Sequence, residues 1–382
     1  MGKLKAAVIG TGFTAAAHIE AVRRLGVAEI VALAGSSEAT AKAKAAGWGI
    51  PRAYGDYREM LADPDIQVVH NCTPNHVHHE INKAVILAGK HILSEKPLAV
   101  SSAESAELLR LAEERGVVHG VNFNYRQFPM VRQLASMIRS GELGKIYLIH
   151  GGYLQDWLLY DTDYNWRLEP EIGGRSRAIA DIGSHWCDTV QFVTGLKIRS
   201  VFADLTTVHP VRKKPAARVA TFERQDGAEA DLVSVSTEDC ASVLVRFEGG
   251  AKGAFTVSQV SAGRKNRLSL EVSGERKSAF WNQEEPEKLW LGYRDKANEV
   301  LLADPSLAAS EARANFHYPG GHNEGWPDSL KNQMLHFYSR ILSGRGGSET
   351  IPTFATFEDG HNLVRITEAI LESNARQAWV DV

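Results

Sequence analysis

A glycine-rich turn near the start of this 382-residue chain has residue types suited to binding a dinucleotide. The turn reads Gly10-Thr11-Gly12-Phe13-Thr14-Ala15, the G-x-G-x-x-A form of the dinucleotide fingerprint. The first glycine permits a tight turn, the second lets the backbone approach a diphosphate, and the small last residue allows close helix packing. A helix that starts here points its N-terminus at the anion. The turn predicts a cofactor site, and the alternative is an ordinary glycine turn.

The ribose of such a cofactor is expected at the end of the next strand, where an acidic residue is usual. Here Val31-Ala32-Leu33-Ala34 runs into Gly35-Ser36-Ser37 without a carboxylate. Ser36 and Ser37 are suited to accept a phosphate, with Lys42 or Lys44 behind them, but the arginine typical of NADP binding is absent. The sequence therefore predicts NAD or NADP and leaves the choice open.

Two further segments directly follow expected strands, where ligands of open parallel sheets lie. They are Thr73-Pro74-Asn75-His76 and Glu95-Lys96-Pro97. Asn75 is expected to cap a helix, which would place His76 at a helix N-terminus near the cofactor. His78 and His79 add two imidazoles, but they match no zinc motif and would point about 100° apart on a helix. No metal site is expected.

These segments belong to a region in which strand-like and helical patterns alternate, which is typical of βαβ units on a parallel sheet. Strands are expected at 4–9, 29–34, 53–54, 67–72, 91–94 and 117–122. Helices are expected at 15–25, 39–46, 57–61, 77–88 and 103–115. The prediction is a doubly wound Rossmann domain over residues 1–125.

The pattern changes after residue 126, where strands separated by glycine-containing turns indicate an antiparallel sheet. These strands are expected at 146–153, 201–207, 234–237, 242–247, 251–258 and 266–273. The basic stretch at 211–215 is expected to be a solvated loop. A second α/β domain is therefore predicted over residues 126–382.

Composition restricts the partners of the chain. The formal net charge is −3 and no dense basic stripe is present, so nucleic acid is not an expected partner. Three cysteines without a CxxC pair indicate neither a disulfide framework nor a zinc site. No apolar run approaches the roughly 18 residues of a membrane span. A cytoplasmic protein with a small-molecule partner is expected.

Taken together, the motifs resemble the Gfo/Idh/MocA family, the relatives of glucose–fructose oxidoreductase and inositol dehydrogenase. The matching pieces are the glycine turn, Thr73-Pro74-Asn75, Glu95-Lys96-Pro97, Tyr125-Arg126 and Asp181-Ile182-Gly183-Ser184-His185. The resemblance covers essentially the whole chain, because residues 358–382 also read like the family's closing helix. It implies an α/β protein whose Rossmann domain precedes a domain with a large, open, mainly antiparallel sheet. It also implies a homo-oligomer, a dimer or a tetramer, and adds Asn124 and Arg126 to the expected cofactor site.

The resemblance also implies a catalytic group. Lys96 matches the family's lysine, and Asp181 and His185 match its D-x-x-x-H pair. Residues four apart share one face of a helix. Histidine, with a pKa near 6.5, is suited to take the proton of an alcohol. Lys96 would stabilise the alkoxide charge that develops on the substrate oxygen. Asp181 would orient these groups or help relay the proton. Without the resemblance, Asp181 reads equally as a helix cap and His185 as a core histidine beside Trp186.

A segment rich in aromatic, amide and guanidinium groups is a candidate substrate site. Its predicted substrate residues, with one from a later loop, are Tyr153, Trp157, Tyr164, Trp166, Arg167 and His322. Flat aromatic rings can cover the apolar faces of sugars while polar groups reach the hydroxyls. Packing in a core or an oligomer contact is the alternative. Arg175 and Arg177 follow Arg167, which leaves room for an anionic sugar.

The sequence thus predicts an NAD(P)-dependent dehydrogenase of a sugar, sugar derivative or polyol. One alternative is an NAD-dependent glycoside hydrolase that oxidises its sugar transiently and shares every motif named above. The other is a non-catalytic cofactor-binding regulator, which the presence of Lys96 and His185 disfavours.

Overall fold

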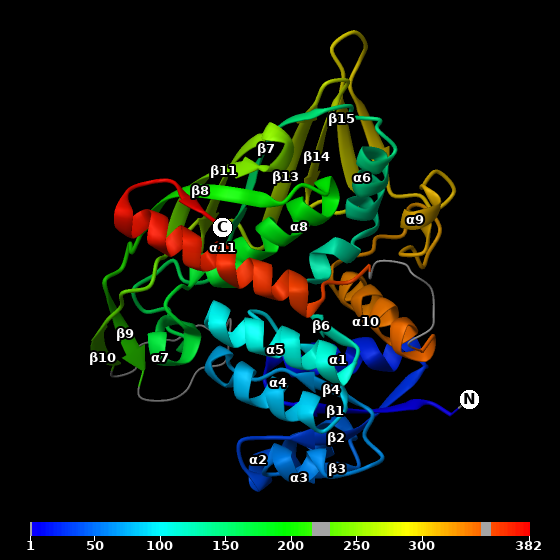
Figure 1. Cartoon of the computed structure of the whole chain (residues 1–382), viewed down its shortest axis with the longest axis vertical. Coiled ribbons are helices and arrows are strands. Elements are labelled where there is room, and N and C mark those ends of the chain that lie inside the picture. Colours follow the sequence, from blue (N-terminus) through cyan, green and yellow to red (C-terminus); the bar gives the residue numbers. More distant parts are fainter. Residues whose placement is uncertain (1, 216–229, 345–352) are drawn as a thin grey trace. The chain divides into compact units, whose positions relative to one another are not determined.

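The N-terminal part of the computed structural model is built on a six-stranded parallel sheet in the order β3-β2-β1-β4-β5-β6 (Figure 1). The structure describes residues 2–215, 230–344 and 353–382. The strands are β1 (Leu4–Ile9), β2 (Ala28–Ala34), β3 (Arg52–Tyr54), β4 (Val68–Asn71), β5 (His91–Ser94) and β6 (His119–Val121). The helices between them are α1 (Phe13–Leu25), α2 (Glu38–Trp48), α3 (Tyr57–Leu61), α4 (His78–Leu87) and α5 (Ser102–Arg115).

This sheet is covered on both faces, as its sequence requires. Ala6, Ala7 and Val8 of the central strand β1 are completely buried, which is typical of a strand with helices above and below it. Because β2 and β5 lie on opposite sides of the β1–β4 pair, right-handed connections place α1 and α4 on opposite faces. Helices α4 and α5 pack side by side (Figure 1). The predicted doubly wound Rossmann domain is confirmed.

The chain divides into two compact units, and it enters the first one twice. Unit 1 comprises the chain through Asn124 and Pro327–Val364, and unit 2 comprises Tyr125–Trp326 and Arg365–Val382. Nearly all of α10 (Trp326–Leu342) and the first part of α11 (Phe357–Arg376), through Val364, belong to the returning part. In unit 1 the carbonyl of Ala355 accepts a hydrogen bond of 2.8 Å from the backbone of Val121. The expected ranges, 1–125 and 126–382, give no place to this return.

Unit 2 contains a nine-stranded mixed sheet, mostly antiparallel, in the order β16-β15-β14-β13-β7-β12-β11-β8-β17. Its strands are β7 (Ile146–Leu154), β8 (Ile198–Thr206), β11 (Cys240–Phe247), β12 (Lys252–Ser258), β13 (Arg267–Gly274), β14 (Ser278–Asn282), β15 (Lys288–Gly292), β16 (Glu299–Leu302) and β17 (Val380–Asp381). Helices α6 (Pro129–Arg139) and α8 (Ser184–Thr194) contact this sheet. Trp186 of α8 stacks on Phe255 at 4.5 Å between ring centroids, so the core of unit 2 lies on this face.

Two predictions for this unit are wrong. Residues 211–215 are not a loop but strand β9 (Val211–Pro215), which pairs with β10 (Ala230–Ser234). Arg212 of this strand is fully buried among backbone carbonyls and Asp239. The strand expected at 234–237 is β10, which ends at Ser234. Two short α-helices are α7 (Pro170–Gly173) and α9 (Ser310–Arg313).

Candidate active site

The turn between β1 and α1 has the backbone that the dinucleotide fingerprint requires. Gly10 has a φ of +112°, and a Cβ atom there would lie 2.4 Å from the carbonyl oxygen of Cys72. Gly12 directly precedes α1, and a Cβ atom on it would meet no atom within 4 Å. Ala15, in the first turn of α1, is completely buried. The space beside Gly12 and the helix N-terminus therefore fits a diphosphate group.

The two glycines predict two different defects when each is replaced by alanine. Gly10→Ala is expected to lower the melting temperature by about 2–10 °C, because the side chain strains the backbone and overlaps the Cys72 carbonyl. Gly12→Ala is expected to leave the melting temperature unchanged and to weaken NADH binding, because its methyl group occupies the space for the diphosphate. Thermal unfolding and NADH fluorescence titration measure both. Wild-type stability in Gly10→Ala would contradict this reading of the turn.

At the end of β2, one of the two predicted phosphate acceptors, Ser36, is exposed, whereas the other, Ser37, caps a helix. The Ser37 hydroxyl caps α2 by accepting the N–H of Thr40 at 3.2 Å. Glu38 then begins α2 and pairs with Lys42 at 2.6 Å. Sequence reasoning overlooked this carboxylate, which follows the serines directly. Its negative charge disfavours the 2′-phosphate of NADP at this end of the strand.

At the ends of β4 and β5, a buried histidine joins the two loops predicted to meet the cofactor. The ring nitrogens of His78 lie 2.6 Å from the Pro97 carbonyl oxygen and 2.8 Å from that of Thr73. Burial lowers the pKa of His78, and these two backbone hydrogen bonds oppose that shift. Asn75 starts a 3-10 turn whose cap is Pro74, so the predicted capping by Asn75 is wrong. His76 in the same turn is exposed.

Glu95 directs its carboxylate into the protein interior. One oxygen accepts from the Asn122 amide at 2.7 Å and lies 2.9 Å from Nε2 of His18, and the other accepts the Lys96 N–H at 3.2 Å. Burial alone would raise the pKa of Glu95, but His18, the Lys96 charge and the Asn122 hydrogen bond lower it to about 2. The ionised carboxylate thus holds the backbone of Lys96, the predicted catalytic lysine.

His18 extends this contact into a buried chain that sequence reasoning missed. Its Nδ1 lies 3.0 Å from Nδ1 of His70, whose Nε2 lies 2.8 Å from the Tyr338 hydroxyl. Because an ionised carboxylate only accepts, His18 donates to Glu95, and in neutral rings His70 then donates to His18 and accepts from Tyr338. The chain links α1, β4, the end of β5 and α10. The signal in the sequence was the two histidines inside otherwise apolar elements.

In unit 2, Asp181 and His185 lie on either side of a junction between two kinds of helix. Asp181 is inside a π-helical turn (Ile179–Gly183), and His185 is the second residue of α8. The regular helix expected for this pair is therefore interrupted, as is common at functional sites. One oxygen of Asp181 accepts from Nε2 of Gln259 at 2.8 Å, and the other lies 3.5 Å from Nε of Arg167.

His185 is buried against two tyrosines. Its ring meets Tyr125 edge to face at 4.8 Å and lies 6.2 Å from Tyr153. The two tyrosine hydroxyls are 2.5 Å apart, and the amide of Asn266 donates to Tyr125 at 3.0 Å. Burial raises the pKa of Tyr125 to about 12 and that of Tyr153 well above its usual value. Both hydroxyls are therefore protonated, and Asn266 is a member of this cluster that sequence reasoning missed.

The predicted recognition residues divide into packing and polar groups. Trp157 and Tyr164 pack against a small apolar cluster of Leu158, Leu168 and Val235, which supports the packing alternative for these two rings. Trp166 lies under the guanidinium of Arg167 at 4.4 Å, next to Asp181.

Arg177, expected as a possible anion-binding group, is completely buried and bound to Asp239 and Gln259. That expectation is corrected, because a guanidinium surrounded by protein acceptors does not face a substrate. Arg175 remains exposed.

Three more predicted residues lie in protein contacts. Arg126 forms a buried, two-fold ion pair with Asp188 at 2.8 and 2.5 Å, so its charge is neutralised inside unit 2. Its expected cofactor role stays a prediction. Asn124 is buried and donates to the Ser329 hydroxyl at 2.8 Å. His322 is exposed in a loop, with Nδ1 3.1 Å from the Pro319 carbonyl oxygen.

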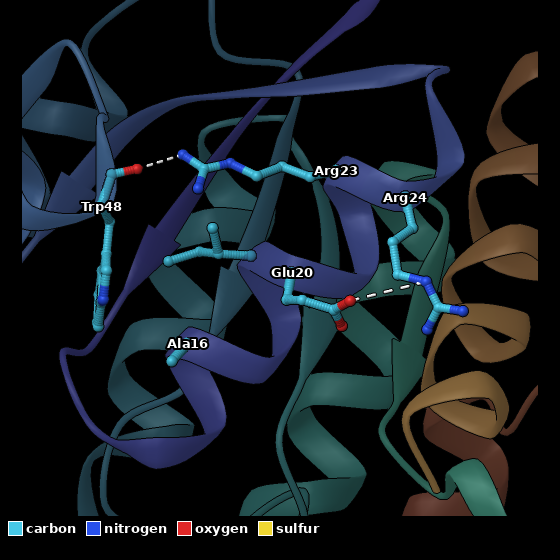
Figure 2. A pocket seen from close by; sticks show the side chains of 6 residues that line it. Ala16, Glu20, Arg23, Arg24 and Trp48 are labelled. Carbon is cyan, nitrogen blue, oxygen red and sulfur yellow. Dashed lines mark hydrogen bonds and ion pairs between the residues drawn. The ribbon is translucent and has the colours of Figure 1, made fainter. Parts of the chain in front are cut away.

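Unit 1 also has a surface hollow that other residues line. Figure 2 shows it between the outer side of α1 and the last residue of α2, where Arg23 reaches the Trp48 carbonyl and Glu20 pairs with Arg24. Its lining is Ala16, Ile19, Glu20, Arg23, Arg24 and Trp48. None of the predicted site residues lines this hollow.

Comparisons with known proteins agree with this geometry. Residues 4–123 match the oxidoreductase family with an NAD-binding Rossmann fold, and residues 131–280 match the GFO/IDH/MocA C-terminal domain. A levoglucosan dehydrogenase of Pseudarthrobacter phenanthrenivorans is 31% identical over 398 aligned residues, covering 100% of this chain and 99% of the relative. A 1,5-anhydro-D-fructose reductase of Ensifer adhaerens is 36% identical over 179 residues, 46% of this chain and 51% of the relative.

Solved structures extend the likeness to the whole fold. A levoglucosan dehydrogenase in complex with NADH and L-sorbose has a TM-score of 0.89 at 29% identity, covering 100% of this chain and 99% of the other. This chain therefore belongs to the Gfo/Idh/MocA family of oxidoreductases. Its first domain is an NAD-binding Rossmann domain. Among the described residues, no helix is long and apolar enough to cross a membrane.

Proposed function

We propose that this enzyme exchanges hydride between NAD and a hydroxyl-bearing carbon of a neutral sugar or polyol. The relationship to levoglucosan dehydrogenase over the full length of both chains carries the proposal. Related structures hold NADH with levoglucosan or with L-sorbose, which supports a neutral sugar as the substrate. Two of the three arginines considered for an anionic sugar are bound to carboxylates of the protein, Arg177 to Asp239 and Arg167 to Asp181, which favours a neutral sugar.

Each predicted catalytic residue has a distinct role in this proposal. When bound, NAD supplies the carbon that accepts the hydride. Lys96 donates to the substrate oxygen and stabilises the negative charge that develops on it. His185 takes the hydroxyl proton as the hydride leaves the same carbon, and Asp181 orients this transfer. The buried Glu95 carboxylate fixes the backbone from which Lys96 extends.

The groups around His185 suit the recognition of hydroxyls. Tyr125, Tyr153 and Asn266 form a hydrogen-bonded cluster, and Gln155 extends it by donating to the Asn266 side-chain oxygen at 3.0 Å. Hydroxyl and amide groups both donate and accept, as sugar hydroxyls do. Trp157 borders the cluster through a hydrogen bond to Gln155. We therefore propose Tyr153 and its neighbours as the substrate-facing set.

A spectrophotometric screen tests this proposal and its main rival. The purified protein is incubated with NAD or NADP and with levoglucosan, L-sorbose, myo-inositol or aryl glycosides, and absorbance at the reduced-nicotinamide band is followed. The proposal predicts reduction of NAD by a neutral sugar or polyol. Cleavage of a glycoside without net reduction would instead identify the NAD-dependent glycoside hydrolase, which shares Lys96, Asp181 and His185.

A cytoplasmic location is part of the proposal. Cys72, Cys187 and Cys240 all form no disulfide, and the first two are buried. Free thiols of this kind are usual in reducing compartments.

We further propose that the open face of the nine-stranded sheet makes a homo-oligomer, a dimer or a tetramer. The strand registers place one row of side chains across eight strands of this face. The row is Phe202, Leu244, Ala254, His150, Glu271, Phe280, Trp290 and Val300. Leu244 is 50% exposed and Val300 is 55% exposed, so the row is largely apolar and open in the single chain.

Replacing Leu244 with glutamate is expected to separate this oligomer, because it puts an unpaired charge into the apolar row. Size-exclusion chromatography with light scattering measures the molar mass. Leu307→Glu is the matched control, since Leu307 is 66% exposed but lies in a loop outside the sheet. A wild-type protein with the mass of one chain would overturn the proposal.

A further inference from the structure

Asp181 is held from behind by a residue that the sequence did not mark. Gln259 directly follows strand β12, and its side chain is completely buried. Its amide lies between Arg177 and Asp181, 2.9 Å from Nη1 of the arginine and 2.8 Å from Oδ2 of the carboxylate. Its backbone is fixed as well, because its N–H donates to the Asp239 carbonyl at 3.0 Å.

The surrounding charges allow this amide only one orientation. A guanidinium has donors and no acceptor, so the Gln259 oxygen must face Arg177. The Gln259 nitrogen then faces Asp181 and donates to it. Arg177 is itself fixed, because the buried carboxylate of Asp239 binds it, and Arg212 at 2.6 Å from the same oxygen holds Asp239. The chain from Asp239 to Asp181 therefore has a defined direction.

A donor held in this way acts on the charge and the direction of the Asp181 carboxylate. A hydrogen bond donated to a carboxylate favours its ionised form. Arg167 approaches the other oxygen at 3.5 Å, and His185 lies four residues further along the chain. Burial raises the pKa of the Tyr125 and Tyr153 hydroxyls, and the charge of this carboxylate raises both further.

We propose that Gln259 is a positioning residue, which keeps Asp181 ionised and aimed so that it can orient the proton transfer to His185. The inference rests on the proposed function, because it gives Asp181 a task in the hydride exchange. It adds a specific requirement: position 259 must carry a donor without a negative charge.

The isosteric variant Gln259→Glu tests this requirement. Glutamate keeps the oxygen that binds Arg177 but places a second carboxylate 2.8 Å from Asp181, where two ionised carboxylates repel each other. The acid limb of kcat/KM against pH is expected to move up by at least about one pH unit, with KM for NAD unchanged. Gln259→Met, which has similar length and no donor, is expected to lower kcat about tenfold at neutral pH.

The matched control is Gln133→Glu in helix α6. Gln133 is also a buried glutamine of unit 2, and its oxygen accepts the Ala309 N–H at 2.8 Å. This variant is expected to keep the wild-type pH profile. A wild-type profile in Gln259→Glu, together with wild-type kcat in Gln259→Met, would overturn the inference. If none of the sugars and polyols tested supports reduction of NAD by the wild-type enzyme, the proposed function itself fails. That failure is distinguishable from a failure of the inference about Gln259.

Discussion

Lys96→Met is expected to lower turnover by about 10²–10⁴-fold while NADH binds with unchanged affinity. The methionine side chain has a similar length to that of lysine but no hydrogen-bond donor and no charge. The developing alkoxide on the substrate would therefore lose its donor, whereas the glycine turn that fits the diphosphate lies elsewhere in unit 1. Steady-state kinetics with the substrate found in the screen gives the loss, and NADH fluorescence titration gives the affinity.

A lysine with a purely structural task provides the control for this variant. Lys83 in helix α4 pairs with Glu107 at 2.7 Å on the surface of unit 1. Lys83→Met is expected to keep turnover within about twofold, because exposed ion pairs contribute little. Near-normal turnover in Lys96→Met would show that Lys96 does not act on the substrate oxygen.

His185→Phe is expected to have the second-largest effect, again about 10²–10⁴-fold on turnover. Phenylalanine preserves an aromatic ring against Tyr125, so the packing at 4.8 Å is retained while the proton acceptor is lost. Melting temperature and NADH affinity should remain close to those of the wild type. The measurement is kcat under saturating NAD and substrate.

Another histidine of unit 2 separates chemistry from the general cost of losing an imidazole. His209 bonds the Leu159 carbonyl at 2.9 Å, away from the tyrosine cluster. His209→Phe is expected to keep turnover near normal. If His185→Phe also retained it, the proton would have to be taken by another group, and the proposed role of His185 would be lost.

The cofactor domain was predictable because its signals are local. β1 and β5 have the predicted bounds, since a short apolar run bounded by glycine or charged residues leaves few alternatives for a buried parallel strand. Strand β9 was missed because Lys213 and Lys214 read as solvated, and its partner β10 lies beyond residues 216–229. Pairing between distant segments has no local signature, and the same holds for the return of 327–364 to unit 1.

The site was predictable only in part, for the same reason. The glycine turn and the Glu95-Lys96-Pro97 segment could be proposed as site segments because both follow strands. The interior role of Glu95 depends on His18, 77 residues away, and the burial of Arg177 depends on Asp239, 62 residues away. Gln259 carried no signal, because a single glutamine after a strand has no function until Arg177 and Asp181 are placed on either side of it.

Transfer of deuterium from the substrate to the cofactor is the sharpest test of the proposed hydride exchange. The enzyme is given NAD and the neutral sugar, polyol or glycoside on which the screen shows it to act, with deuterium at every carbon-bound position, and the cofactor and the sugar product are both analysed by mass spectrometry. Hydride exchange predicts that each NADH formed carries a single deuterium from the substrate carbon, with the sugar recovered as its carbonyl product. Loss of the deuterium to water, with NAD recovered unreduced and a glycosidic bond broken, would contradict it.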